Sequence, residues 1–209
     1  MPGQDRLAIL EVVADEVRGC PKCELARGRT HAVPGEGNPN ARIMFIGEAP
    51  GHHEDQQGKP FVGNSGQFLT TLIEKAGLKR EDVFITNIVK CRPPSNRDPL
   101  PDEIDICTSN YLERQIEAID PEVIVTLGRF SMSRYFPGER ISKIHGQAKM
   151  VGGRLIVPMY HPAAALHQGN LRSTLEDDFG KLPRMLAEQD KRRESEAEKK
   201  RSATQGTLF

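Results

Sequence analysis

Four cysteines are the residues whose type and spacing most directly suggest chemistry. Cys20 and Cys23 form a C-x-x-C turn in CPKC, and Cys91 and Cys107 lie much further along the chain. A C-x-x-C turn lets two thiolates point at one metal centre, and two distant cysteines can complete the ligand set. The cysteines therefore predict a metal site that joins the N-terminal part of the chain to its middle.

The spacing leaves the metal open between zinc and a 4Fe–4S cluster, which both accept four thiolates. Structural zinc usually has two tight C-x-x-C pairs, and the wide second pair here favours the cluster. Four unrelated buried cysteines are the alternative, but CPKC is polar and Cys91 lies between Lys90 and Arg92. A thioredoxin-like role for CPKC requires a preceding strand, where the sequence predicts a helix.

A second group of polar residues follows apolar runs that are typical of buried strands. GEAPG follows ARIMFIG, Asn87 ends VFITN, Gly128 ends VIVTLG, and His161 follows RLIVPMY. The carboxyl ends of parallel strands share one edge of a sheet, which is where ligands bind in open α/β proteins. We therefore expect these residues to converge on one site, whereas an ordinary α/β surface would scatter them.

The elements that position these residues alternate between strands and helices. Strands are expected at 41–47, 83–87, 123–128 and 154–160. Helices are expected over 7–19, from Ser65 to about 76, from Pro101 to about 119, briefly from Arg129, and from Ser173 towards Ala187. This alternation predicts an α/β fold with a mostly parallel, four-stranded sheet.

Composition predicts one domain followed by a tail. The 209 residues contain no apolar run long enough to span a membrane, and the N-terminus lacks the features of a signal peptide. A cytoplasmic location is expected, where cysteines serve as thiols or metal ligands. The domain is expected over 1–188; residues 189–209 are highly charged and are expected to be a flexible tail.

Net charge gives no sign of nucleic-acid binding, because Lys+Arg and Asp+Glu both number 29. A tight non-specific DNA-binding protein is usually basic, so any positive charge for DNA must be local. Ordinary solvated surface is an equally good interpretation of the two candidate groups. These groups are Lys90, Arg92 and Arg97, and Arg140, Lys143 and Lys149.

Three segments make the chain resemble the family 4 uracil-DNA glycosylases, the iron–sulfur members of the uracil-DNA glycosylase superfamily. They are GEAPGHHEDQQGKPFVGNSG (47–66), TNIVKCRPPSNR (86–97) and YHPAAAL (160–166). The resemblance covers about residues 5–187 and matches the four cysteines to that family's cluster ligands. It implies a three-layer α/β/α fold, a 4Fe–4S cluster, and excision of uracil from single- and double-stranded DNA.

The resemblance implies a uracil pocket, and three side chains suit its chemistry. Phe61 could stack on a base flipped out of the DNA. The amide of Asn87 offers one donor and one acceptor, which match uracil O4 and N3–H. His161 could donate to uracil O2 as negative charge develops there. Taken singly, Phe61 has the alternative of a core aromatic, Asn87 that of a strand-end cap, and His161 that of a structural hydrogen-bonding group.

Two carboxylates, Glu54 and Asp55, lie in the loop expected after the first strand, and either could orient water. The better-known family 1 enzymes have GQDPY in this loop, with a water-activating Asp and a Tyr that excludes thymine. This chain has Ala49 and Gly51 at those positions. As in family 4, Glu54 is therefore the candidate for water activation, thymine exclusion or both, and Glu48 is expected to belong to the uracil-binding loop.

Other residues have expected roles outside the reaction itself. Asn96 is expected to hold its loop or the DNA backbone. Leu166 is a candidate wedge for the gap left by the flipped base, or equally a core leucine. His145, in ERISKIHG, resembles the histidine through which some superfamily members trap DNA covalently. His52, His53 and His167 have no assigned role.

The chain ends in Gln205-Gly-Thr-Leu208-Phe209. This pattern resembles the short peptide with which many bacterial repair and replication proteins bind the sliding clamp. A meaningless apolar terminus is the alternative.

The sequence thus predicts a monomeric DNA glycosylase. An iron–sulfur electron-transfer or redox-sensing protein is the main alternative, although such a protein has no need of the GEAPG loop. A non-catalytic nucleotide-binding module is a further alternative, and it would not require Glu54 or His161.

Overall fold

A six-stranded sheet forms the centre of the computed structural model, which describes residues 3–205. The strand order is β1-β3-β2-β4-β6-β5. The strands are β1 (Glu36–Gly37), β2 (Ile43–Gly47), β3 (Phe84–Asn87), β4 (Val123–Leu127), β5 (Lys149–Val151) and β6 (Arg154–Met159). The four inner strands are parallel, whereas β1 and β5 pair antiparallel at the edges.

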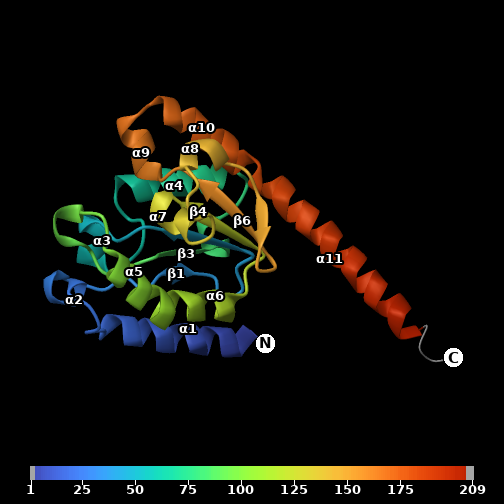
Figure 1. Cartoon of the computed structure of the whole chain (residues 1–209), viewed down its shortest axis with the longest axis horizontal. Helices are drawn as coiled ribbons and strands as arrows, with labels where there is room; N and C mark the ends of the chain where they lie inside the picture. The colour runs from blue at the N-terminus through green and yellow to red at the C-terminus, as the bar shows by residue number, and fades with distance from the viewer. Residues whose placement is uncertain (1–2, 206–209) are drawn as a thin grey trace.

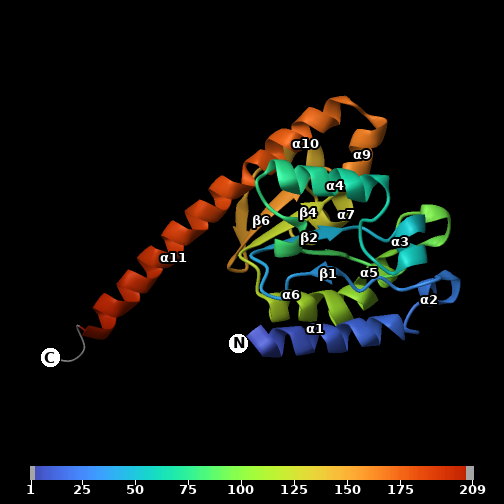
Figure 2. The same cartoon turned by 180° about the vertical axis from the view of Figure 1, so that it is seen from behind.

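Helices cover both faces of this sheet, so the expected α/β fold with three layers is confirmed. The helices are α1 (Gly3–Arg18), α2 (Leu25–Gly28), α3 (His52–Gln57), α4 (Asn64–Lys75), α5 (Pro101–Cys107), α6 (Glu113–Ile119), α7 (Arg129–Ser133), α8 (Ile141–Ile144), α9 (Pro162–His167), α10 (Asn170–Gly180) and α11 (Leu182–Gln205). Helices α1 and α6 lie below the sheet in Figures 1 and 2, and α4, α9 and α10 lie above it.

Side chains along the inner strands point alternately to the two faces of the sheet, so that each face has its own hydrophobic core. In β2, Met44 and Ile46 pack with α1 and α6, while Ile43 and Phe45 pack with α4 and α10. Every residue of β2 is buried, as expected for a parallel strand covered on both sides. Burial on both faces fixes the register of the sheet and thus the positions of its carboxyl ends.

The number of strands corrects the sequence-based prediction. The four predicted strands are the parallel ones, but the sheet has six. Strands β1 and β5 are short and largely exposed, with two and three residues. They carry no apolar alternation that could have revealed them.

Three helix predictions also need correction. The helix expected over 101–119 is interrupted by a π-helical segment, Thr108–Leu112, directly after Cys107. Ser65 is not the N-cap of α4, because Gly63 takes that position. The segment expected as a loop after the first strand contains α3, which carries Glu54 in its first turn.

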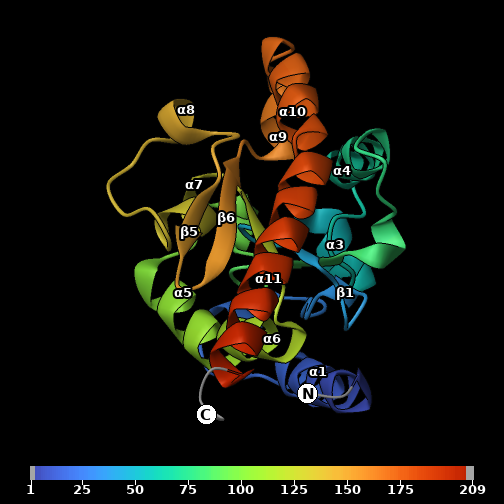
Figure 3. The same cartoon turned by 90° about the vertical axis from the view of Figure 1, so that its right-hand side faces the viewer.

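Helix α11 is the largest departure from the expected organisation. One helix was expected from Ser173 towards Ala187, but two helices, α10 and α11, cover this stretch, and Gly169 rather than Ser173 is the N-cap of α10. Helix α11 continues to Gln205 as one 24-residue helix, which projects from the body of the molecule in Figure 1 and crosses in front of it in Figure 3. Its middle is held by ion pairs: Asp190 contacts Arg42 at 2.5 Å, and Arg193 contacts Glu122. In the described part of the chain, no helix combines the length and the apolar character needed to cross a membrane.

Candidate active site

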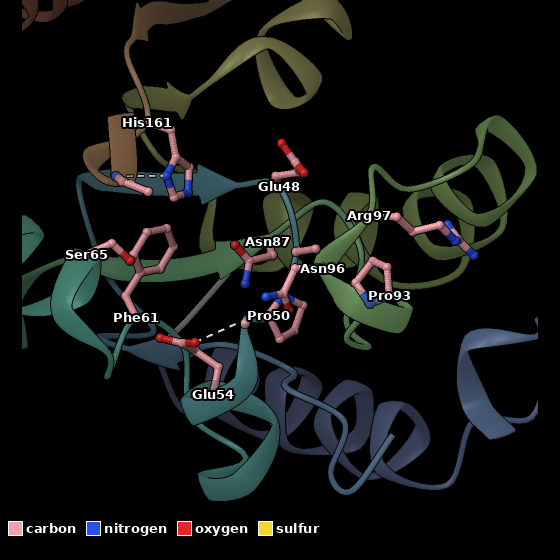
Figure 4. A pocket seen from close by; sticks show the side chains of 13 residues that line it. Glu48, Pro50, Glu54, Phe61, Ser65, Asn87, Pro93, Asn96, Arg97 and His161 are labelled. Carbon is pink, nitrogen blue, oxygen red and sulfur yellow. Dashed lines mark hydrogen bonds between the residues drawn. The ribbon is translucent and has the colours of Figure 1, made fainter. Parts of the chain in front are cut away.

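A cavity of about 390 Å³ opens at the carboxyl ends of the parallel strands. Its walls include most of the residues that the sequence predicted for the pocket (Figure 4): Glu48, Ala49, Gly51, Glu54, Phe61, Asn87, Asn96 and His161. The structure adds Pro50, Ser65, Pro93, Arg97 and Ala163. These residues come from segments far apart in sequence, and the strand order brings them together.

The geometry of His161 fixes which ring nitrogen carries a proton. His161 caps the start of α9, and its Nδ1 lies 3.1 Å from the backbone N–H of Ala163. An N–H can only donate, so Nδ1 is the acceptor and the neutral ring carries its proton on Nε2. Burial lowers the pKa of His161 to about 4, partly opposed by the charge of Glu54. The ring is therefore a neutral hydrogen-bond donor at pH 7.

Asn87 ends β3 beside Gly47 of β2. The residue is 1% exposed, and no group among the described residues donates to its side-chain Oδ1. A Cβ on Gly47 would lie 2.3 Å from this oxygen and 2.6 Å from the ring of Phe61. Glycine at position 47 therefore gives the Asn87 amide and the Phe61 ring room to pack against the backbone of β2. The buried Oδ1 of Asn87 remains available as an acceptor for a ligand.

Phe61 reaches the cavity from a strained turn. Its φ is 52°, in the left-handed region that non-glycine residues rarely adopt. A Cβ on Gly66 would lie 2.0 Å from the Phe61 carbonyl oxygen, so the turn packs directly on the start of α4. The ring lies at 28° to that of His161, with centroids 5.6 Å apart. Strain of this kind is typical of positions fixed for function.

Glu54 holds two walls of the cavity together. Its Oε1 accepts from the backbone N–H groups of Val62 and Gly63 at 2.9 Å, and its Oε2 accepts from that of Gly51 at 3.1 Å. The residue is 8% exposed. By contrast, no hydrogen bond between described residues engages the carboxylate of Glu48 in the same cavity. Burial, and then the nearby Asp98, raise the pKa of Glu48, which Arg129 partly offsets.

The rim of the cavity is polar. Asn96, with a left-handed φ of 53°, accepts through Oδ1 from Arg92 Nε at 2.8 Å. Arg97 donates two hydrogen bonds to the buried carboxylate of Glu103, at 2.7 and 2.9 Å. Leu166 does not line the cavity and is 49% exposed on α9.

Two other candidate residues lie away from the cavity. Lys90, considered for DNA contact, is 1% exposed and its ammonium is enclosed, so that interpretation is wrong. His145 pairs through Nδ1 with Asp178 at 2.7 Å and is not among the lining residues.

A second cavity collects the four cysteines, which also meet Arg29, Lys90 and Tyr111 there. Three of the sulfur atoms accept hydrogen bonds: Cys20 from Lys22 N–H, Cys91 from Arg29 Nη1, and Cys107 from Lys90 N–H, at 3.5, 3.1 and 3.2 Å. Burial raises the pKa of Cys23 and Cys91, and that of Cys107 to about 12. Over residues 3–205, no three His, Cys, Asp or Glu side chains are arranged to hold a metal ion.

Comparison with known proteins agrees with the fold and the cavity. The family model for the uracil DNA glycosylase superfamily matches residues 34–181. The chain is 55% identical over 188 residues to the type-4 uracil-DNA glycosylase of Saccharolobus solfataricus, covering 85% of this chain and 87% of that protein. It is 42% identical over 181 residues to the type-4 uracil-DNA glycosylase of Thermotoga maritima, covering 84% and 94%. The chain belongs to the uracil DNA glycosylase superfamily and, within it, to the type-4 family.

Proposed function

We propose that this protein is a DNA repair glycosylase that hydrolyses the N-glycosidic bond of uracil in DNA and leaves an abasic site. One observation carries the proposal: among the described residues nothing bonds to the buried Oδ1 of Asn87, a residue that lines the same cavity as the neutral His161. An acceptor and a donor fixed in the walls of one cavity match uracil N3–H and O2. An electron-transfer protein needs neither group.

In the proposed reaction, the base leaves as an anion and the sugar gains positive character. Phe61 stacks on the flipped uracil. The Asn87 amide donates to O4 and accepts from N3–H, a pattern that cytosine does not present. His161 donates from Nε2 to O2, where charge accumulates as the bond to C1′ breaks. Backbone groups of the loop containing Ala49 and Gly51 complete the uracil contacts.

The two pocket carboxylates take different parts in this proposal. Three backbone N–H groups occupy the carboxylate of Glu54, so its main contribution is to hold the loops and to place negative charge near the sugar. The carboxylate of Glu48 makes no hydrogen bond to another described residue, and the pKa of Glu48 is raised. Both properties suit a group that orients the attacking water. This assignment shifts water activation from Glu54 to Glu48.

The rim residues are proposed to contact DNA. Leu166 is an exposed apolar side chain on α9, the helix that His161 caps, and exposure is what a wedge that fills the space of the flipped base requires. Asn96 and Arg92 are bonded to each other at the rim and are proposed to contact the DNA backbone. Covalent trapping through His145 is not supported, because this side chain lies outside the cavity and is paired with Asp178.

A 4Fe–4S cluster is proposed at the four cysteines. The donor set fits it: four thiols meet in one cavity, and N–H groups already point at three of the sulfurs, as is common around such clusters. When bound, the cluster links the end of α1 to the segment after β3 and to α5. Thiolate ligation suits the predicted cytoplasmic location.

Uracil release from a labelled oligonucleotide tests the proposed function. The protein is incubated with otherwise identical oligonucleotides that contain one uracil or one thymine, and abasic sites are cleaved with alkali. Cleavage at uracil but not at thymine is expected for single- and double-stranded substrates. No cleavage at uracil by protein with full iron content would refute the proposal. Light scattering on the same sample tests the expected monomer.

We also propose that the C-terminal peptide binds a sliding clamp. Gln205 is the last residue of α11, and Leu208 and Phe209 lie outside the described residues. At about 1.5 Å per residue, the 24 residues of α11 span roughly 36 Å. We propose that α11 acts as a spacer between the catalytic body and the clamp-binding peptide, so that the clamp and the DNA can be engaged together.

Deletion of residues 205–209 tests the clamp proposal. The deletion should abolish binding to the cognate clamp in a pull-down and leave uracil release from short oligonucleotides unchanged. Full-length protein that shows no binding at tens of micromolar clamp, or a truncated protein that loses basal activity, would contradict it.

A further inference from the structure

Lys90 is a charged residue with no place in the reaction described above. Its side chain is 1% exposed and lies wholly inside the protein. The ammonium donates three hydrogen bonds, to Thr86 Oγ1 at 2.6 Å, to the Asn87 carbonyl oxygen at 2.8 Å and to Gln115 Oε1 at 2.7 Å. All three donors of the ammonium are therefore used, and each acceptor is an uncharged oxygen.

Burying the Lys90 ammonium lowers the stability of the folded protein, so its presence calls for a functional explanation. A buried ammonium loses its hydration, and here no carboxylate bonds to it in return. An apolar side chain of similar length would avoid this cost. The bonds that Lys90 makes indicate what it provides, because two of its three acceptors belong to the last two residues of β3.

The hydrogen-bond network extends from Lys90 to α6 and to the segment before β1. Thr86 Oγ1 donates to the Pro34 carbonyl at 2.9 Å, and Gln115 Nε2 donates to the same oxygen at 2.7 Å. Gln115 belongs to α6, so the end of β3 is tied to this helix and to the segment before β1. The carbonyl of Asn87 is thus fixed from inside the protein while its side chain faces the cavity.

The backbone of Lys90 contacts the cysteine cavity. Its N–H donates to Cys107 Sγ at 3.2 Å, and the residue lines that cavity together with Cys91. Lys90 is therefore in direct contact with both the cysteine cavity and the residue proposed to read uracil.

We propose that Lys90 is a positioning residue that fixes the Asn87 amide against uracil by holding the Asn87 carbonyl and the Thr86 hydroxyl. The proposal rests on the proposed function, and specifically on recognition of uracil by Asn87. Its distinguishing consequence is that Lys90 acts through Asn87. Loss of the ammonium must matter only while the Asn87 amide is present.

A double-mutant cycle tests this consequence. Lys90→Met keeps the length of the stem and the backbone N–H but removes the three side-chain bonds. Single-turnover uracil release should fall about 10–100-fold, the range typical of outer-shell partners, while affinity for DNA and iron and sulfide content stay unchanged. In an Asn87→Ala background the same substitution should cause no further loss. In a His161→Ala background, the control, the two losses should multiply, since these groups act on different atoms of the base.

Each other outcome overturns the proposal. A full additional loss in the Asn87→Ala background, an unchanged rate in Lys90→Met alone, or a Lys90→Met protein without iron shows that Lys90 does not act through Asn87. If Lys90→Met does not fold, Thr86→Val removes one acceptor of the ammonium at nearly constant volume. Thr86→Val should give a smaller loss that is again absent with Asn87→Ala. Failure of the proposed function is distinct, because wild-type protein would then release no uracil.

Discussion

The uracil pocket and the cysteine cavity are built on opposite principles although they share one chain segment, residues 86–91. In the pocket, polar atoms are left without partners within residues 3–205: Asn87 Oδ1 is buried and accepts no hydrogen bond there, and His161 uses Nδ1 as its acceptor, which leaves the Nε2 proton for a ligand. In the cysteine cavity, backbone and guanidinium N–H groups already point at three sulfur atoms. The pocket thus offers unused hydrogen-bonding atoms to a ligand, whereas the cysteine cavity offers thiols that the protein already surrounds with hydrogen-bond donors.

The two sites also differ in the structural elements that hold their side chains in place. Glu54 joins two separate segments, the N-cap of α3 at Gly51 and the turn after Phe61, through hydrogen bonds from their backbone N–H groups. The cysteine cavity is instead formed by helix ends, at the ends of α1 and α5. Substitutions should therefore separate the two sites. Cysteine variants should affect stability, and pocket variants should affect mainly the rate, with Glu54, which holds the backbone of the pocket, as the exception.

The largest effect is expected for the cysteines. Cys107→Ala should lose most bound iron and sulfide and lower the free energy of unfolding, since binding energy at such a site is partly folding energy. Iron and sulfide analysis, an absorbance spectrum and a denaturant titration measure this. A stable Cys107→Ala protein with its full absorbance would remove Cys107 from the ligand set.

The next effect concerns the donor in the pocket. His161→Ala should lower the single-turnover rate by about 10²–10³-fold, the usual cost of losing one preorganised donor. Saturating enzyme isolates the chemical step, and iron content and DNA affinity should remain at wild-type values. If only DNA affinity falls, His161 binds DNA and does not stabilise the leaving base.

The two pocket carboxylates should respond differently to the same change. Glu48→Gln should slow the chemical step by about 10²-fold, the low end for a general base, without altering the free energy of unfolding. Glu54→Gln should lower both quantities, because its N–H partners lose bonds to a charged acceptor worth about 1.5–3 kcal/mol each. Equal unfolding curves for the two variants would contradict the assignment of Glu54 as the group that holds the loops.

The smallest expected effect is that of pH on His161. Its pKa is lowered to about 4, so the ring should stay neutral from pH 8 down to about 5. Below pH 6.5, His161 is protonated in the unfolded chain but stays neutral in the folded protein. The free energy of unfolding should therefore fall as the pH approaches 4. Nitrogen-15 NMR of the imidazole should show an Nε2–H tautomer throughout the higher range. A resonance that titrates near pH 6.5 would contradict the buried, neutral donor.

Much of this arrangement follows from sequence patterns. The apolar runs at 41–47 and 154–160 predicted β2 and β6 within two residues at each end, because buried parallel strands read as continuous apolar segments. The strand ends then placed Asn87 and His161 on one edge.

Other features depend on contacts that no local pattern reveals. Lys90 reads as a surface charge beside Cys91, and only the fold buries its ammonium against Gln115 of α6 and the last two residues of β3. Glu54 reads as a loop carboxylate, although its bonds to residues 51, 62 and 63 give it a structural part. The extent of α11 was missed because its exposed, charged sequence has no apolar face beyond its first turns.

The central claim is that the Asn87 amide reads uracil, and Asn87→Asp tests it most directly. The substitution keeps size and shape but replaces the donor to O4 by an acceptor. Base release is measured under single-turnover conditions from matched oligonucleotides that contain uracil or cytosine. We expect uracil release to fall by at least about 10²-fold, with weak release of cytosine, whose amino group is a donor. Unchanged uracil release by a folded Asn87→Asp protein with full iron content would contradict the claim.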